Sequence, residues 1–270
     1  MLRLDDVKCA RSDKPPLNLS LARSASASAG RNRERKLRNS REKEGAPTAS
    51  VIAALRKLGS ERAREAMTRF AIVSENALGV SVPDIRALAK RIGCDHELAG
   101  ALWRTGIHEA RVLTAFIVDP ARVTAAQMDR WVRDFDNWAI CDTFCFHLFH
   151  RTPHAWAKVE KWSDNPREFV KRAAFALLAS IALHDKNAPD EPFLNSLRLI
   201  ESAASDERNF VKKGVSWALR RIGRRNRTLN ASAVELARRL AASSESARRW
   251  IGKDAMKELT SDAVRQRLRA

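Results

Sequence analysis

The sequence predicts an all-helical protein built from stacked helical repeats. Three segments resemble one another at nearly constant spacing: FVKRAAFALL from Phe169, FVKKGVSWAL from Phe210 and WIGKDAMKEL from Trp250, with offsets of 41 and 40 residues. No segment alternates apolar and polar residues as a half-buried strand does, and the chain has no Asn-Gly or Asp-Gly hairpin signal. These observations favour helices over strands throughout.

A period near 40 residues is typical of two-helix units of the HEAT type, in which each unit buries its apolar face only by stacking on its neighbours. The fourth residue of each segment is basic, namely Arg172, Lys213 and Lys253. If equivalent helices line one side of the stack, these residues form a ladder of positive charge on a basic concave face, with Lys171 and Lys212 beside it. The alternative is that they are ordinary surface cations of solvated helices.

The chain divides by composition into a tail and one repeat domain. Residues 1–47 are predicted to be a basic, disordered tail, because they contain few large apolar residues and many Ser, Ala, Arg and Lys. Residues 48–270 are predicted to form a single HEAT-like domain of short helices.

Caps and breakers define the expected helices in order. Ser81 and Pro83 begin a helix that stops before Gly93, and Thr124 with Gln127 has the form of a capping box. The expected helices cover 51–58, 61–71, 82–92, 96–105, 108–119, the segment around Trp131, a helix from Asn137, 154–162, 167–183, 194–204, the Phe210 segment and two or three helices from Ser232 onward.

The charge balance indicates a polyanionic partner. The chain has 50 Lys and Arg against 32 Asp and Glu, a formal charge of +18 and a sequence pI near 10.7. Removing the 12 basic and 6 acidic residues of positions 1–50 leaves 38 and 26, a net charge of +12 for the rest. Such a balance favours nucleic acid over an anionic membrane surface.

Cysteine usage and hydropathy suggest a location. The four cysteines form no CxxC pair, and no apolar run approaches the ~20 residues that cross a bilayer. We therefore expect a cytoplasmic protein, associated with the nucleoid if the source is bacterial.

The residues best placed for chemistry lie in DFDNWAICDTFCFHLFHR, from Asp134 to Arg151. A helix beginning near Asn137 puts Trp138 and Asp142 on one face, four residues apart. An acid among so many apolar residues is either paired with an arginine of a neighbouring repeat or exposed in a cleft where it works. The residues alone leave both interpretations open.

Four stretches together resemble the AlkD-type DNA alkylation repair family of HEAT-like-repeat DNA glycosylases: NALGVSVPDIRALAKRIG, FDNWAICD, FVKRAAFALLA and FVKKGVSWALRRIGRRN. The likeness covers roughly residues 50–260. It implies catalytic roles for Trp138, Asp142 and Trp217, with DNA bound by Arg172 and by the basic ladder.

The resemblance implies excision of cationic N3- or N7-alkylated purines from duplex DNA by hydrolysis of the glycosidic bond, as in base excision repair. Asp142 would stabilise the sugar cation, and Trp138 and Trp217 would pack against the sugar. Arg172 would hold a phosphate bidentately. We expect a monomer without metal or cofactor. Ala139 departs from the family, whose members often have Asp directly after the first Trp.

Two other function classes stay open. One is a catalytically inactive helical-repeat module that binds damaged or branched nucleic acid, and the other is a scaffold for an acidic protein. Cys141 and Cys145 fit no usual zinc spacing. The arginines of RRIGRRNR, residues 220–227, either contact phosphates or form a solvated helix end. The remaining tryptophans are expected to pack in the core: Trp103, Trp131, Trp156 and Trp162.

Overall fold

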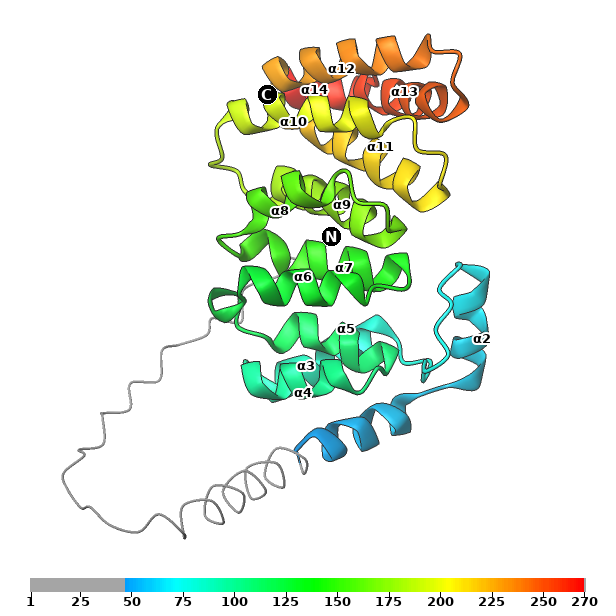
Figure 1. Ribbon diagram of the computed structural model, residues 1–270, viewed down its shortest axis with the longest axis vertical. Helices are drawn as coiled ribbons and strands as arrows, with labels where there is room; N and C mark the ends of the chain where they lie inside the picture. Colours follow the sequence, from blue (N-terminus) through cyan, green and yellow to red (C-terminus); the bar gives the residue numbers. More distant parts are fainter. Residues whose placement is uncertain (1–46, 270) are drawn as a thin grey trace, which may run out of the picture. The chain divides into compact units, whose positions relative to one another are not determined.

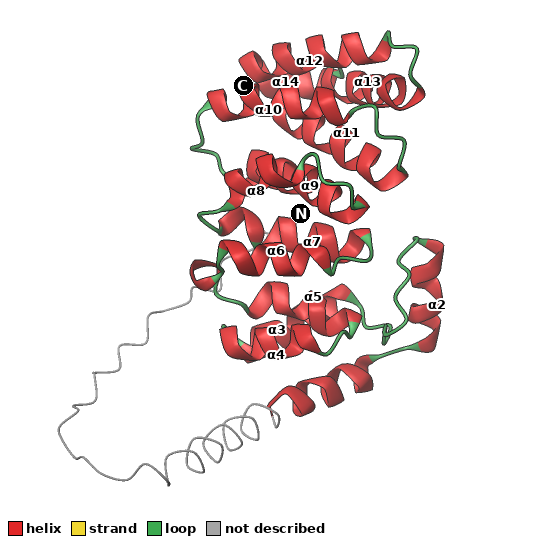
Figure 2. Cartoon of the chain, viewed as in Figure 1, coloured by secondary structure: helices red, strands yellow, loops and turns green. Residues whose placement is uncertain are grey.

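The computed structural model describes residues 47–269, which contain helices and loops and no strand (Figure 2). The all-helical prediction is confirmed for these residues. They form two compact units, one of residues 47–67 with 75–119 and the other of residues 68–74 with 120–269. The predicted tail lies outside the described residues, apart from Pro47, which begins a helix.

The first unit contains four helices and the start of a fifth. α3 and α4 both pack on α5. The Ser81 side chain accepts the N–H of Asp84 and starts α3 where the sequence predicts. The helical segments are residues 47–58, α2 (Glu61–Arg69), α3 (Val82–Ile92), α4 (His96–Arg104) and α5 (His108–Ile117); the end of α2 belongs to the second unit.

A buried carboxylate organises the loop before α3. Glu109 of α5 is fully buried and accepts the backbone N–H groups of Leu78, Gly79 and Val80, at 2.8, 2.7 and 3.3 Å. Three donors compensate the desolvation of this charge. Glu109 therefore fixes the loop in the first unit and has a structural explanation.

The second unit is a stack of helix pairs, α8 with α9, α10 with α11 and α12 with α13, preceded by α6 and α7, which meet through the rings of Trp131 and Phe144 (Figure 1). α9 packs against both α7 and α11, and α11 also packs against α13. The bounds are η1 (Pro120–Arg122), α6 (Ala125–Arg133), α7 (Trp138–His147), η2 (Phe149–Arg151), α8 (Ala155–Trp162), α9 (Glu168–His184), α10 (Asp190–Ala203), α11 (Asn209–Gly223), α12 (Arg227–Ala241), α13 (Ser246–Leu259) and α14 (Asp262–Arg269).

The sequence of α9 explains its central place. Phe175, Leu177 and Leu178 point to different sides of the helix, and all three are fully buried. A helix that is apolar nearly all round must be covered on several sides. In the structure α7, α8 and α11 provide that cover.

An ion-pair network joins α6 to α8. Asp129 pairs with Lys158 at 2.7 Å, and the indole N–H of Trp162 donates to its other oxygen at 2.9 Å. Burial opposes ionisation of Asp129, but the hydrogen bonds from Lys158 and its neighbours outweigh it and lower the pKa of Asp129 to about 2. Trp103, Trp131 and Trp162 are buried and Trp156 packs edge-on against Phe193, so these four tryptophans pack as predicted.

Two helices begin earlier than the sequence predicted. α12 starts at Arg227 rather than Ser232, because Asn226 caps it by accepting a backbone N–H of the first turn. α10 starts at Asp190, ahead of Pro192, because a proline in the first turn costs no intrahelical hydrogen bond.

Two helical glycines provide a paired test of the packing. A Cβ on Gly214 of α11 would lie 3.5 Å from the Arg172 side chain, in ordinary contact, whereas one on Gly252 of α13 would lie 2.2 Å from the backbone of Ala241. We expect Gly214→Ala to raise the free energy of unfolding by about 0.5–1 kcal/mol. Gly252→Ala should lower it by about 1–3 kcal/mol. Urea unfolding measures both, and a change of the same sign in the two variants would contradict this packing.

Candidate functional site

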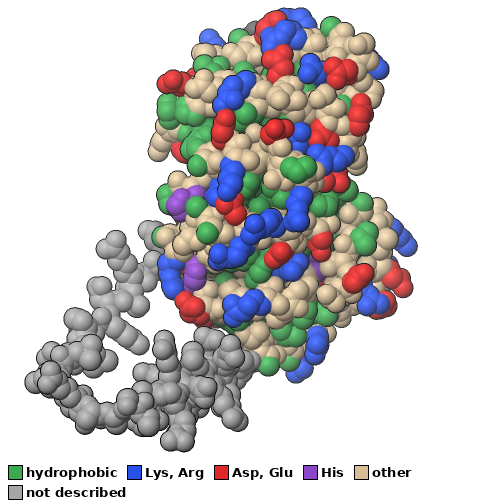
Figure 3. Space-filling view, viewed as in Figure 1, with side chains coloured by type: hydrophobic (Ala, Val, Ile, Leu, Met, Phe, Trp, Pro, Cys, Tyr) green, Lys and Arg blue, Asp and Glu red, His purple; other side chains and the backbone are tan. Residues whose placement is uncertain are grey.

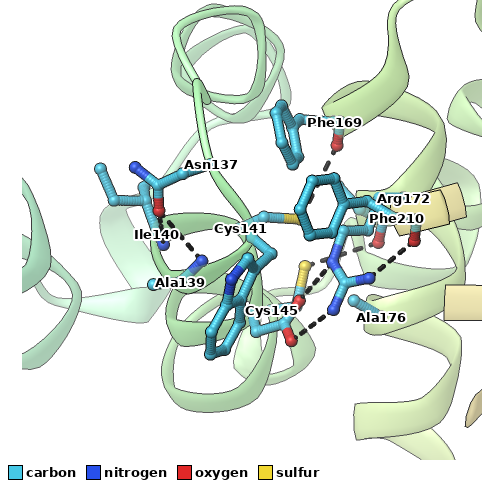
Figure 4. Close-up of polar contacts among 12 residues, drawn as sticks. Asn137, Ala139, Ile140, Cys141, Cys145, Phe169, Arg172, Ala176 and Phe210 are labelled. Atoms are coloured by element: carbon cyan, nitrogen blue, oxygen red, sulfur yellow. Dashed lines mark hydrogen bonds and ion pairs between the residues drawn. The ribbon is translucent and has the colours of Figure 1, made fainter. Parts of the chain in front are cut away.

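The site is built on α7, whose start is fixed by Asn137. The Asn137 side chain accepts the backbone N–H groups of Ala139 and Ile140 at 3.0 and 3.1 Å (Figure 4). This cap places Trp138 in the first turn and Asp142 one turn later. The Asp142 side chain is 22% exposed, although its helix neighbours Cys141 and Cys145 are fully buried.

Arg172 of α9 holds Asp142 with two parallel hydrogen bonds. Its Nε donates to Oδ1 at 2.9 Å and its Nη2 donates to Oδ2 at 2.7 Å. Its Nη1 donates to the carbonyl of Phe210 at 2.6 Å (Figure 4). One guanidinium thus connects α7, α9 and α11.

Burial and pairing act in opposite directions on this pair. Burial raises the pKa of Asp142 above its ordinary value, and the charge and hydrogen bonds of Arg172 offset part of that rise. For Arg172, burial lowers the pKa, but the Asp142 carboxylate raises it further, so the guanidinium stays charged. Arg172 therefore favours the carboxylate form of Asp142.

Asp142 and Arg172 lie in the wall of an open pocket of about 380 Å³, which we call the tryptophan pocket. Four helices of the second unit contribute to it. Its lining residues are Asp142 of α7, Arg172 of α9, Lys213, Trp217 and Arg220 of α11, and Trp250 and Asp254 of α13. The structure thus brings together four residues singled out in the sequence: Asp142, Arg172, Lys213 and Trp217.

The sequence analysis missed Trp250 and Asp254 as site residues. A signal was present, because WIGKD has the same Trp-x-x-x-Asp spacing as WAICD. Asp254 accepts a hydrogen bond from Ser216 and lies 3.4 Å from Nε of Arg220. A second carboxylate therefore faces the same pocket.

Trp138 does not line the tryptophan pocket. Its ring is partly exposed, and its indole N–H donates to the carbonyl of Phe70 at 2.8 Å. Phe70 itself is 67% exposed. The predicted catalytic role of Trp138 stays a prediction.

The residues of the basic ladder differ in their surroundings. Lys171 is nearly buried and pairs with Asp206 at 3.1 Å, and Lys212 lies 5.3 Å from the ring centre of Trp250. Lys213 and Lys253 are exposed. Their contacts with DNA, like the contact of Arg172 with a phosphate, stay predictions, and the partners of Arg172 in this structure are protein groups.

The two free cysteines of α7 have backbone partners. The thiol of Cys141 faces the carbonyl of Phe169 at 3.7 Å, and that of Cys145 faces the carbonyl of Ala173 at 3.4 Å. Within residues 47–269, no group of three or more His, Cys, Asp or Glu side chains has a geometry that would hold a metal ion.

The family model described as "DNA alkylation repair enzyme" matches residues 51–259. The chain belongs to this family. The resemblance seen in the sequence is therefore confirmed. None of the curated proteins matches the chain significantly.

Two solved structures are similar to the chain to different degrees. One, described as "a new family of proteins related to the HEAT-like repeat DNA glycosylases with affinity for branched DNA structures", has a TM-score of 0.69 and 20% identity, covering 82% of this chain and 95% of its own. A designed armadillo repeat protein in complex with the peptide (KR)4 has a TM-score of 0.35 and 15% identity, covering 68% and 78%. The first likeness confirms the HEAT-like repeat fold. Every helix within residues 47–269 is too short or too polar to cross a membrane.

Asp206 explains why Lys171 is withdrawn from solvent, and its contribution can be measured. Hydrogen bonds from Arg208, together with the weaker one from Lys171, lower the pKa of Asp206 to about 2 against the effect of burial. An acid whose pKa is lower in the folded state stabilises the fold at pH values above its pKa in the unfolded state, which is near 3.8 for Asp206. This stability is lost as the pH falls towards 2. We expect Asp206→Asn to cost about 1–2 kcal/mol at neutral pH, after allowance for solvent screening, and nothing near pH 2.

Chemical denaturation at several pH values measures this cost. The exposed Asp164 provides a matched control, because Asp164→Asn removes the same charge from the surface. Equal losses in the two variants would show that Asp206 is no stronger an anchor than a surface acid.

Proposed function

We propose that this protein is a DNA glycosylase that excises cationic N3- or N7-alkylated purines from duplex DNA and leaves an abasic site. The observation that carries the proposal is the Asp142 carboxylate, held by Arg172 in the wall of an open pocket that two tryptophans also line. Membership of the DNA alkylation repair enzyme family supports the substrate class.

The reaction needs little general acid catalysis from the protein, because the leaving base is already positively charged. A purine alkylated at N3 or N7 carries a positive charge, so it leaves as a neutral base with the electron pair of the glycosidic bond. Positive charge then develops on the sugar. The carboxylate of Asp142 stabilises this charge electrostatically and orients the water whose oxygen bonds to the sugar carbon, while the water proton is released.

The tryptophans contribute through their ring faces. Trp217 and Trp250 line the same pocket as Asp142. An indole face attracts a developing cation by about 0.5–2 kcal/mol, depending on desolvation. In this proposal Trp217 keeps the role expected from the sequence, Trp250 is added, and Trp138 supports the site from the preceding turn of α7.

In this proposal Arg172 positions Asp142 and favours its ionised form, and the exposed lysines of the basic ladder bind phosphates. Its guanidinium already donates to Asp142 and to the carbonyl of Phe210. Lys213 and Lys253 are exposed on α11 and α13 and are the ladder residues best placed to meet phosphates. A carboxyl group whose ionised form Arg172 favours suits a reaction whose transition state is positively charged.

A second candidate function is binding of branched nucleic acid without excision. The structural neighbour with 20% identity is described as having affinity for branched DNA structures. Ala139 also stands where the resemblance leads us to expect a second acid. This alternative retains the basic surface and removes the catalytic role of Asp142.

Replacing Asp142 separates the two candidates. We expect the wild-type protein to release 3-methyladenine or 7-methylguanine from methylated duplex DNA, and Asp142→Asn to reduce the rate by at least about 100-fold, as loss of a key electrostatic group does. DNA affinity should stay equal or rise, because a negative charge is removed. Chromatography of the released bases and fluorescence anisotropy of the duplex measure the two quantities.

Asp254→Asn is the matched control, since it removes a carboxylate from the same pocket. We expect it to keep most of the activity. Activity surviving in Asp142→Asn but lost in Asp254→Asn would move the catalytic role to α13. Binding without base release by the wild type would favour the second candidate. Lack of affinity for DNA near physiological salt would favour a scaffold for an acidic protein.

The pH dependence of excision tests the role of Arg172. The charge and hydrogen bonds of Arg172 offset part of the rise that burial causes in the pKa of Asp142. Replacing Arg172 should therefore raise that pKa further and move the acid limb of the rate profile to higher pH. We expect Arg172→Gln to shift the limb upward by about 1–3 pH units. Lys213→Gln, which removes a cation from the same pocket, should leave the limb in place. Coincident profiles for wild type and Arg172→Gln would show that Arg172 does not keep Asp142 ionised.

A further inference from the structure

The second unit contains another pocket, of about 250 Å³, formed by the C-terminal ends of α9 and α11 together with α14. We call it the basic pocket. Its lining carries five cationic side chains and one carboxylate. The residues are Ala182, Leu183, Lys186, Ala188, Asp190, Arg221, Arg224, Arg225, Asn226 and Arg267.

Two of its arginines are committed to the fold. Arg224 pairs with Glu258 at 2.9 Å. Arg225 donates to the carbonyls of Ala182, Asp185 and Ala188 and lies over the ring of Phe193. These bonds close the end of α9, so Arg225 has a structural explanation.

The other three cations have no such partner. Among the described residues, no carboxylate lies within ion-pair distance of Lys186, Arg221 or Arg267, and Asp190 is occupied by the side-chain amide of Asn226 at 2.8 and 2.9 Å. Like charges without a carboxylate in direct contact repel one another, and the nearest acid acting on Arg221, Glu258, is already held by Arg220 and Arg224. A bound anion would relieve this repulsion.

The titration of these groups agrees with a cluster that is only partly neutralised. Burial, followed by the charge of Arg267, lowers the pKa of Lys186. Burial and the charge of Arg224 lower the pKa of Arg221, and Glu258 opposes part of this effect. An anion bound among them would reverse these effects.

The basic pocket continues the helix face that carries the tryptophan pocket. Lys213, Trp217, Arg221 and Arg224 follow one another on α11 at intervals of four, four and three residues, so they share one face. Seven residues separate Trp217 from Arg224, or about 10 Å along the helix. One extended polyanion can therefore reach both pockets.

We propose that the basic pocket binds a backbone phosphate of the same nucleic acid that occupies the tryptophan pocket. Guanidinium groups match phosphate oxygens bidentately, and Lys186 adds a point charge beside them. The inference rests on nucleic-acid binding, which both candidate functions share, and it does not depend on base excision.

The test is the salt dependence of binding to a short fluorescent duplex. One fewer phosphate contact makes the slope of log Kobs against log salt concentration shallower by about 0.9. We expect this change in Arg221→Gln/Arg267→Gln. The control Arg198→Gln/Arg238→Gln removes the same charge from exposed ion pairs on α10 and α12 and should keep the wild-type slope. Equal slopes in the two double variants would overturn the proposal.

Two further measurements separate loss of a phosphate contact from loss of folding. The melting temperature of Arg221→Gln/Arg267→Gln should be no lower than that of the wild type, because the double variant relieves repulsion between cations. Lys186→Gln, at an exposed residue, should make the salt slope shallower in the same direction. A lower melting temperature together with an unchanged slope in Lys186→Gln would overturn the proposal as well.

A free phosphate is the other source of the same chemistry. If inorganic phosphate raises the melting temperature of the wild type but not of the double variant, while the duplex slopes stay equal, the pocket takes a free anion and the assignment to nucleic acid is wrong. Failure of base release with a changed slope would instead leave this site standing and remove only the glycosylase proposal.

Discussion

The bidentate ion pair between Asp142 and Arg172 is the interaction on which the second unit and its candidate site both depend. It joins α7 to α9, and the third donor of Arg172 extends the link to α11. Removing one partner from such a buried pair typically costs about 3–5 kcal/mol, because the other charge is left unpaired. The sequence left open whether Asp142 is paired or lies in a cleft. In the structure it is both, since each of its oxygens accepts one guanidinium N–H and the carboxylate still lines the tryptophan pocket.

This double role sets the electrostatic state of the site. A carboxylate that is only buried would take up a proton readily, and one that is only exposed would be screened by water. Arg172 favours ionisation while the surrounding apolar residues of α7 limit solvent, as the burial of Cys141 and Phe144 indicates. On the proposed function, the carboxylate form that Arg172 favours is the form that the cationic transition state requires.

Much of the fold and of the candidate site could be predicted from the sequence. The parts that could not be predicted have a physical explanation. Some helices that begin at a side-chain cap, such as α3 after Ser81 and α6 after Thr124, start where the sequence predicts, whereas α12 after Asn226 starts earlier. In the structure, one pocket is lined by Asp142, Arg172, Lys213 and Trp217. They meet there because α7, α9 and α11 pack against one another in succession. Trp250 and Asp254 were missed because the repeat alignment paired Trp250 with Phe210, whereas the chemically similar spacing pairs it with Trp138. Periodicity gives a residue its helix but not its direction, which neighbouring repeats decide.

The positions of basic residues in the sequence likewise do not predict which of them are free to bind a polyanion. Lys171 and Arg172 both belong to the basic ladder of the sequence, yet each has an acidic partner, Asp206 and Asp142. On the face drawn in Figure 3, Lys and Arg side chains are interspersed with Asp and Glu rather than gathered in one band. A net charge of +18 therefore describes attraction to a polyanion but does not locate its contacts.

The tryptophan pocket and the basic pocket lie along one face of α11 and differ in how their cations are paired. The tryptophan pocket contains two carboxylates, and each has an arginine beside it in the same lining, Arg172 at Asp142 and Arg220 at Asp254. Because these arginines are engaged by the acids, we expect the phosphates of a DNA strand to be held by cations without such a partner. Lys213 lines the tryptophan pocket itself. Lys186, Arg221 and Arg267 line the basic pocket, whose Arg221 lies about two helical turns beyond Lys213 on α11. On the two proposals together, the paired Asp142 faces the sugar, while cations that have no carboxylate within ion-pair distance hold the phosphates of the same nucleic acid.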